Sequence, residues 1–176
     1  SLGKALAAKG AQLVAVDVNP LDAAWDDQPA PSAAPVAVHD VALAGQSAVD
    51  KREVIADWLK ANGLDTTVMT ALDSIAWTFN IRGTDVSHTP VGLAFALLHA
   101  DATADLFIAP EKVTEAVRAH LGNSVRIHDR DAFEAALADL KDKKVAVDPD
   151  RAVAAIFTAL EAAGAKIERH RDPAVL

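Results

Sequence analysis

The sequence predicts an α/β fold, a three-layer sandwich in which helices cover both faces of a mixed sheet of about six strands. Short runs rich in β-branched residues alternate with amphipathic helix patterns over residues 47–168. Glycines stand just past the predicted helix ends, at Gly63, Gly122 and Gly164. From residue 105 onward, the regular alternation of helix and strand predicts right-handed crossovers and parallel pairing.

The composition supports a folded protein and excludes several functional classes. Of the 176 residues, 51% are hydrophobic and 24% are charged, which is enough apolar material for a buried core. A formal net charge of −8 argues against nucleic-acid binding, because phosphates need a basic face. The absence of cysteine excludes disulfides and thiolate metal sites. The longest apolar run, residues 91–98, is too short to cross a bilayer, so we expect a soluble, cytoplasmic protein without a nucleic-acid or membrane partner.

The sequence predicts that the chain consists of two parts. Residues 1–35 are interpreted as the tail of a preceding domain followed by a proline-rich linker. The tail would consist of the last turns of a helix that ends at Gly10 and a strand over residues 12–16. Four of the eight prolines fall in the linker, which predicts an extended segment. Residues 36–176 form the domain that carries the sheet.

The first half of this domain is predicted to contain a helix, a strand and a hairpin. Ser47 can cap a helix that ends before Gly63, and residues 66–71 read as a strand. Strands over residues 91–99 and 105–109, joined by a tight turn, are expected to pair as an antiparallel hairpin.

Three helix–strand units complete the domain. The helices are expected to begin at Pro110, at Asp131 with Glu134 as its capping-box partner, and at the Asp148-Pro149 pair. The strands that follow them are expected at residues 125–127, 145–147 and 166–168.

One stretch, residues 72–91, combines apolar and polar side chains unusually densely: LDSIAWTFNIRGTDVSHTPV. Asp73 can cap a short helix by accepting bonds from backbone N–H groups two and three residues on. Ile75 and Phe79 share one face of that helix. Because the pattern is apolar on more than one face, Trp77 is predicted to lie in the core.

The second half of this stretch is predicted to be a loop. Asn80 and Gly83 tolerate positive φ, so they are predicted to end the helix and turn the chain. Arg82 is then left three residues from Asp85. In one interpretation the two side chains pair and hold the loop. In the other, an arginine on a loop with rigid support contacts a substrate or a neighbouring domain.

The stretch resembles the N-terminal half of the three-domain Xaa-Pro aminopeptidases (aminopeptidase P, creatinase/prolidase superfamily). Their pattern reads close to L-D-S-I-A-W-L-x-N-I-R-G-S-D-V-x-x-N-P-V, and this chain matches it at Asp73, Ile75, Ala76, Trp77, Asn80, Arg82, Gly83, Asp85, Val86 and Pro90. The resemblance implies a creatinase/prolidase N-terminal-like domain over residues 36–176. It implies structural roles for Asp73, Trp77, Asn80, Gly83, Asp85 and Pro90. Arg82 and His88 are the candidate substrate-binding residues.

The same resemblance implies a parent enzyme that releases an N-terminal residue preceding proline. Its two divalent metal ions, manganese or zinc, are held by a separate C-terminal catalytic domain. None of that domain's ligand motifs occurs here, so we expect no catalytic residue, metal ligand or cofactor in this chain. The implied partners are that catalytic domain, further copies in a homo-oligomer and short proline-containing peptides. The expected function is a non-catalytic domain that shapes the cleft and supports subunit assembly.

Two alternatives stay open. A catalytically inert peptide- or protein-binding module of the same superfamily would share the fold, and an acidic chain could bind basic peptides. A metal-dependent hydrolase would have to use scattered carboxylates such as Asp17, Asp40 and Asp73. The six histidines lack metal-binding spacing, and no phosphate-loop, dinucleotide or nucleophile-elbow motif occurs.

Overall fold

The structure, a computed structural model, describes residues 2–14, 16 and 19–175. The chain divides into two compact units, Ser1–Ser32 and Ala33–Leu176.

The first unit contains two short helices, α1 (Leu2–Ala7) and α2 (Pro20–Ala24). The described residues of the strand expected at 12–16 are not in a strand, and Ala15 lies outside the described residues. Their side chains are exposed, as for Val14 at 68%, and among the described residues no second strand pairs with them. The linker is also less extended than expected. Asn19 caps α2 by accepting a bond from Leu21 N at 3.1 Å, and Pro20 fits the first helical position.

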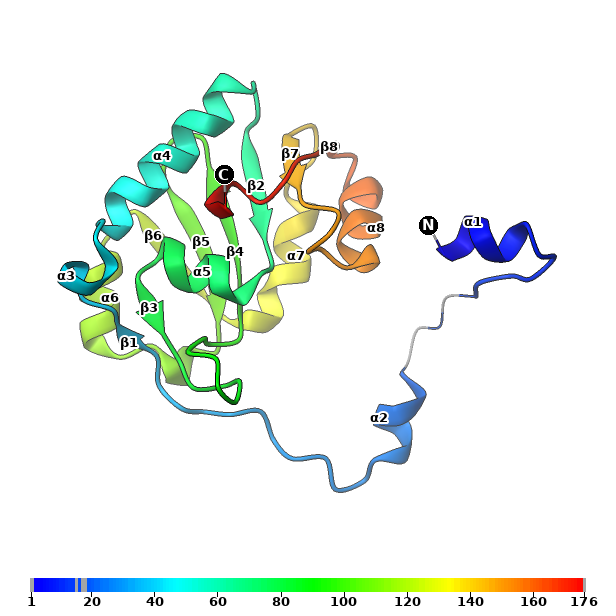
Figure 1. Cartoon of the computed structure of the whole chain (residues 1–176), viewed down its shortest axis with the longest axis horizontal. Coiled ribbons are helices and arrows are strands. Elements are labelled where there is room, and N and C mark those ends of the chain that lie inside the picture. Colours follow the sequence, from blue (N-terminus) through cyan, green and yellow to red (C-terminus); the bar gives the residue numbers. More distant parts are fainter. Residues whose placement is uncertain (1, 15, 17–18, 176) are drawn as a thin grey trace. The chain divides into compact units, whose positions relative to one another are not determined.

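The second unit is built on a six-stranded mixed sheet, which confirms the predicted fold class (Figure 1). The strands are β2 (Thr66–Met69), β4 (Ala94–His99), β5 (Ala104–Ile108), β6 (Val125–His128), β7 (Lys144–Val147) and β8 (Lys166–Arg169), in the order β6-β5-β4-β2-β7-β8. Strand β4 pairs antiparallel with both β2 and β5, whereas the β5–β6, β2–β7 and β7–β8 pairs are parallel. The predicted hairpin and the predicted parallel pairing are therefore both confirmed.

Helices cover both faces of this sheet (Figure 1). The α-helices are α3 (Val41–Ala44), α4 (Ala48–Ala61), α5 (Leu72–Thr78), α6 (Glu115–Leu121), α7 (Phe133–Ala138) and α8 (Ala154–Ala163). One core gathers Leu59 of α4, Phe79 after α5 and Leu121 of α6 on one face of the sheet. A second core gathers Leu137 of α7 and Leu160 of α8 on the other. Because strand side chains alternate in direction, neighbouring strand residues enter different cores.

A second, two-stranded sheet was not predicted. Strand β1 (Ala37–Val38) pairs antiparallel with β3 (Ile81–Arg82), so the segment that enters the domain lies beside the motif stretch. The bond from His39 N to Asn80 O, at 2.7 Å, extends this contact by one residue. The pairing puts Arg82 in a strand rather than a free loop.

Several element boundaries differ from the predictions for local reasons. The helix expected from Pro110 is split into a 3₁₀ turn η1 (Pro110–Lys112) and α6, which Thr114 caps. The predicted strand at 91–99 begins three residues later, because residues 90–93 bond back to the motif stretch. Asp129, not Asp131, caps the turn η2 (Arg130–Ala132). Helix α8 begins five residues after the Asp148-Pro149 pair.

Candidate functional site

Helix α5 opens the motif stretch, and Asp73 does not cap it as predicted. The N-cap position is Ala71, without a side-chain cap bond, so Asp73 falls inside the first turn. In this position its negative carboxylate still interacts favourably with the positive end of the helix dipole. It also pairs with Arg151 at 3.1 Å, although its side chain is 68% exposed.

The far end of α5 is closed by a lysine that the sequence did not single out. Asn80 has φ 48, which confirms the predicted left-handed turn. Its side-chain oxygen accepts a bond from Lys51 Nζ at 2.6 Å, and its amide donates to Gln46 O at 2.8 Å. Lys51 Nζ also donates to Trp77 O at 3.0 Å. Lys51 thus places a positive charge at the negative end of the helix.

Lys51 is almost fully buried, at 1% exposure, and bonds to neutral oxygens. Burial lowers the pKa of Lys51, and the nearby charge of Arg82 lowers it further. The ammonium also lies 4.4 Å from the centroid of the Trp77 ring, a cation–π contact. Trp77 itself is only partly buried and packs at the margin of the core, whereas Ile75 and Phe79 are fully buried. The prediction for Trp77 therefore holds in part.

The expected Arg82–Asp85 pair is replaced by two separate sets of contacts. Arg82 Nη1 donates to Ala76 O at 2.8 Å and to Ile81 O at 2.9 Å, which ties the partly buried guanidinium to α5. The Asp85 carboxylate pairs with Lys112, and both side chains are buried. Two charges interact more strongly in the interior than at the surface, because less water screens them.

Gly83 is required by packing and not by its dihedral angle, so the positive-φ prediction is wrong. A Cβ placed on Gly83 would lie 2.7 Å from Gly92 N and 2.9 Å from Val91 C. The two arms of the loop over residues 83–93 therefore approach backbone to backbone, which only glycine allows.

The two candidate substrate-binding residues have different surroundings. Arg82 is held in β3, whereas His88 is exposed in a turn and has φ 60. The turn is closed by the bond from Thr89 N to Val86 O at 3.2 Å. Bonds from Gly83 N to Pro90 O and from Asp85 N to Val91 O, at 3.4 and 3.2 Å, join the two arms. The loop thus connects the two candidates, and Pro90 belongs to its closing arm.

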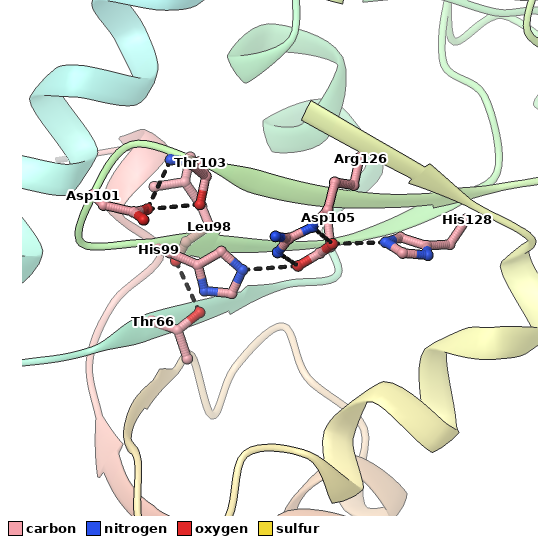
Figure 2. A network of polar contacts seen from close by, with 8 residues as sticks. All are labelled: Thr66, Leu98, His99, Asp101, Thr103, Asp105, Arg126 and His128. Atoms are coloured by element: carbon pink, nitrogen blue, oxygen red, sulfur yellow. Dashed lines mark hydrogen bonds and ion pairs between the residues drawn. The ribbon is translucent and has the colours of Figure 1, made fainter. Parts of the chain in front are cut away.

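A second polar cluster lies on the sheet and was not predicted (Figure 2). Its centre is Asp105 of β5, which accepts bonds from Arg126 Nε and Nη2, both at 2.7 Å. His99 Nε2 and His128 Nε2 lie 2.8 and 2.6 Å from the same carboxylate. Burial raises the pKa of Asp105, but the bonds from Arg126, His99 and His128 outweigh it and hold the pKa well below its usual range.

Strand register explains this cluster. Asp105 is paired with Leu97 on β4 and with Arg126 on β6, so His99 and His128 are two residues from those partners on the same face. Beside α7 the cluster borders a cavity of about 500 Å³. A sequence signal existed, since His99, Asp105 and Arg126 each stand between two apolar residues, but the strand order is needed to bring them together.

Two of the carboxylates named for a metal-dependent hydrolase, Asp40 and Asp73, have separate structural partners. Asp40 caps α3 by accepting a bond from Ala42 N at 2.7 Å, Asp73 pairs with Arg151, and Asp17 lies outside the described residues. Within residues 2–14, 16 and 19–175, no three His, Cys, Asp or Glu side chains form a group that could hold a metal ion. In the same part of the chain, no helix is long and apolar enough to cross a membrane.

The mixed sheet with helices on both faces is also found in solved structures of other proteins. The N-terminal domain of the cytoplasmic peptidase PepQ from Mycobacterium tuberculosis matches 72% of this chain and 96% of its own, with a TM-score of 0.54; at 16% identity this likeness shows the fold alone. The chain belongs to the creatinase/prolidase N-terminal domain family, whose model matches residues 27–176.

Three relatives show which proteins carrying this domain the chain is similar to. The X-prolyl aminopeptidase from Caenorhabditis elegans, described as a cytosolic enzyme with a di-nuclear active site, is 28% identical with a TM-score of 0.84, over 96% of this chain and 28% of that one. The "Probable Xaa-Pro aminopeptidase P" of Aspergillus niger is 38% identical over 76% of this chain and 22% of its own length. Aminopeptidase P1 of Arabidopsis thaliana is 38% identical over 70% of this chain and 20% of its own. The chain spans about a fifth of the length of these curated relatives.

Proposed function

We propose that this chain acts as a non-catalytic domain of an Xaa-Pro aminopeptidase, a metallopeptidase that removes an N-terminal residue preceding proline. The observation that carries the proposal is the similarity to Xaa-Pro aminopeptidases across most of the chain, at 38% identity to two of them. In this proposal the domain forms part of the wall of the catalytic cleft and supports subunit assembly. Its buried polar groups serve the fold: Lys51 closes a helix, Lys112 neutralises Asp85, and Asp105 joins three strands.

The two divalent metal ions of such an enzyme, manganese or zinc, are assigned to a catalytic domain outside these residues. Among the described residues the acids do not fit these ions, because Asp85 and Asp105 are neutralised by Lys112 and Arg126 and no group of side chains there could hold a metal. The di-nuclear site in the description of the C. elegans relative supports a pair of metals in the parent enzyme. The proposed partners are the catalytic domain and further copies of the subunit, and the proposed location is the cytoplasm.

Arg82 and His88 are proposed to contact short proline-containing peptides. Arg82 uses Nη1 for two backbone carbonyls, which fixes the guanidinium while its planar fork offers further N–H donors. A carbonyl or carboxylate of a peptide is the natural acceptor for such a group. His88 is exposed on the same loop and can take either role in a hydrogen bond.

A titration of the purified chain with an Ala-Pro-Ala peptide, followed by amide chemical shifts, tests this contact. Shift changes centred on Arg82 and His88 are expected, and Arg82→Ala should weaken binding about tenfold to a hundredfold, as for a lost charge-assisted bond. Arg118→Ala, on the exposed side of α6, is the matched control and should leave binding unchanged. Equal affinity of the two variants would remove Arg82 from the proposal. Tighter binding of a Lys-rich peptide without proline would favour the inert binding module.

A further inference from the structure

A buried ion pair joins the loop over residues 83–93 to the turn η1. Lys112 and Asp85 are 27 residues apart, and their side chains are 3% and 1% exposed. The same Asp85 oxygen that pairs with Lys112 also accepts a bond from Leu93 N at 2.7 Å. One carboxylate oxygen therefore holds both arms of the loop: Asp85 itself lies in the first arm, and the bond from Leu93 N attaches the second arm.

The backbone of Lys112 holds a third segment. Its carbonyl accepts a bond from Val36 N at 3.0 Å, and Val36 is buried at 2% exposure. The Val36 side chain fills the space next to Gly92, where a Cβ would meet Val36 Cγ1 at 2.7 Å. Lys112 thus connects the entering segment, the loop and η1 at one point.

We propose that Lys112 is the positioning residue of the loop over residues 83–93, which carries His88 and directly follows Arg82. This inference rests on the proposed peptide contact for its functional meaning. Burying an ammonium and a carboxylate is costly, so the pair need not add net stability, and the role that we infer for it is to fix the geometry of the loop. The two backbone bonds that join the arms of the loop, from Gly83 N to Pro90 O and from Asp85 N to Val91 O, are long at 3.4 and 3.2 Å, so the charge-assisted contact is the stronger attachment between the arms and η1.

Hydrogen exchange of backbone amides in Lys112→Met tests the proposal on the chain as it exists. Without the ammonium, Asp85 is buried without that charge partner and the loop is expected to open. The amides of Asp85, Thr89 and Leu93 should then exchange about tenfold to a hundredfold faster, while those of β4 and β5 keep their rates. Lys60→Met is the matched control, because Lys60 forms an exposed ion pair with Asp57 at 3.0 Å. It should leave all these rates unchanged.

Lys112→Arg separates positioning from general stability. It keeps the charge, so it should restore slow exchange in the loop and a single His88 imidazole resonance. In Lys112→Met, that resonance should shift toward the position of a flexible histidine. If Lys112→Met does not fold, the double variant Asp85→Asn with Lys112→Met removes both charges and is read by the same pattern.

Two outcomes overturn the proposal: unchanged loop exchange in the methionine variants, or equal acceleration in the loop, β4 and β5. The exchange measurement needs no peptide, so it stands even if the peptide titration fails. Conversely, the loop could open in Lys112→Met although the wild-type chain does not bind the peptide. That result would support Lys112 as the positioning residue of the loop and would reject only the proposed peptide contact.

Discussion

Two polar clusters in the second unit are built in opposite ways. Around the end of α5, Lys51 and Arg82 direct their charges at backbone carbonyls and at the Asn80 amide. On the sheet, Asp105 is held by three charged or titratable side chains. The first cluster fixes the path of the backbone and the second fixes strands against each other. Substitutions that change the space around the backbone should therefore destabilise the first region most, whereas changes of charge or pH should destabilise the second cluster most.

The largest expected effect is a change of shape at Gly83. Gly83→Ala should lower the free energy of unfolding by about 3 kcal/mol or more, because its Cβ meets backbone atoms that cannot move aside. Gly83→Asn should be no better, since the obstacle is not the dihedral angle. Gly45→Asn is the control: Gly45 has φ 76 with open space around it, and asparagine tolerates that region. Urea unfolding measures all three, and a well-tolerated Gly83→Asn would restore the dihedral explanation.

Next in size is the charge at the centre of the sheet cluster. Asp105→Asn should cost about 2 kcal/mol at pH 7, because the carboxylate accepts several charge-assisted bonds. Its folded pKa is depressed, so this stabilisation is present above the ordinary value of 3.8 and is lost as pH falls below it. The gap between wild type and Asp105→Asn should therefore shrink between pH 5 and pH 2, measured by urea unfolding. A stability gap that stays constant with pH would contradict this charge-based explanation. Asp57→Asn changes an exposed carboxylate and is the control, so its stability should differ very little from that of the wild type.

Trp77→Ala should have an intermediate effect. Trp77 is partly buried, so the loss should be about 2 kcal/mol, below the usual 3–5 kcal/mol for a fully buried aromatic residue. Part of it comes from the contact with Lys51. Thermal unfolding checks the value against Trp25→Ala, which changes a half-exposed tryptophan of the first unit. Equal melting temperatures for both variants would place Trp77 outside the core margin.

The smallest expected effect is at Asp73. It does not cap α5, and its ion pair with Arg151 is largely exposed, so Asp73→Ala should cost no more than about 0.5 kcal/mol. Ser47→Ala is the comparison, because Ser47 does cap α4 by accepting a bond from Asp50 N at 3.1 Å, and its loss should cost about 1 kcal/mol. A larger loss at Asp73 than at Ser47 would show that its role in the first turn is underestimated.

The two clusters also show what the sequence could predict. Periodicity and capping residues predicted the sheet, the hairpin and the cap at Ser47, because these depend on neighbours in sequence. The left-handed Asn80 was predictable for the same reason. The partners of Asp85 and Asp105 were not, because they come from η1 and from adjacent strands through pairing register. Gly83 was singled out for a positive φ that it does not have, and the close approach of Gly92 that does require a glycine there is visible only in three dimensions.

The central claim, a non-catalytic domain of an Xaa-Pro aminopeptidase, is tested most directly by peptide hydrolysis. The purified chain would be incubated with an Xaa-Pro peptide, with and without manganese, and release of the N-terminal residue measured by chromatography. The account predicts no turnover in either condition, because the described residues offer no group of metal ligands. Metal-dependent release that persists through purification, and that is lost on chelation, would contradict it.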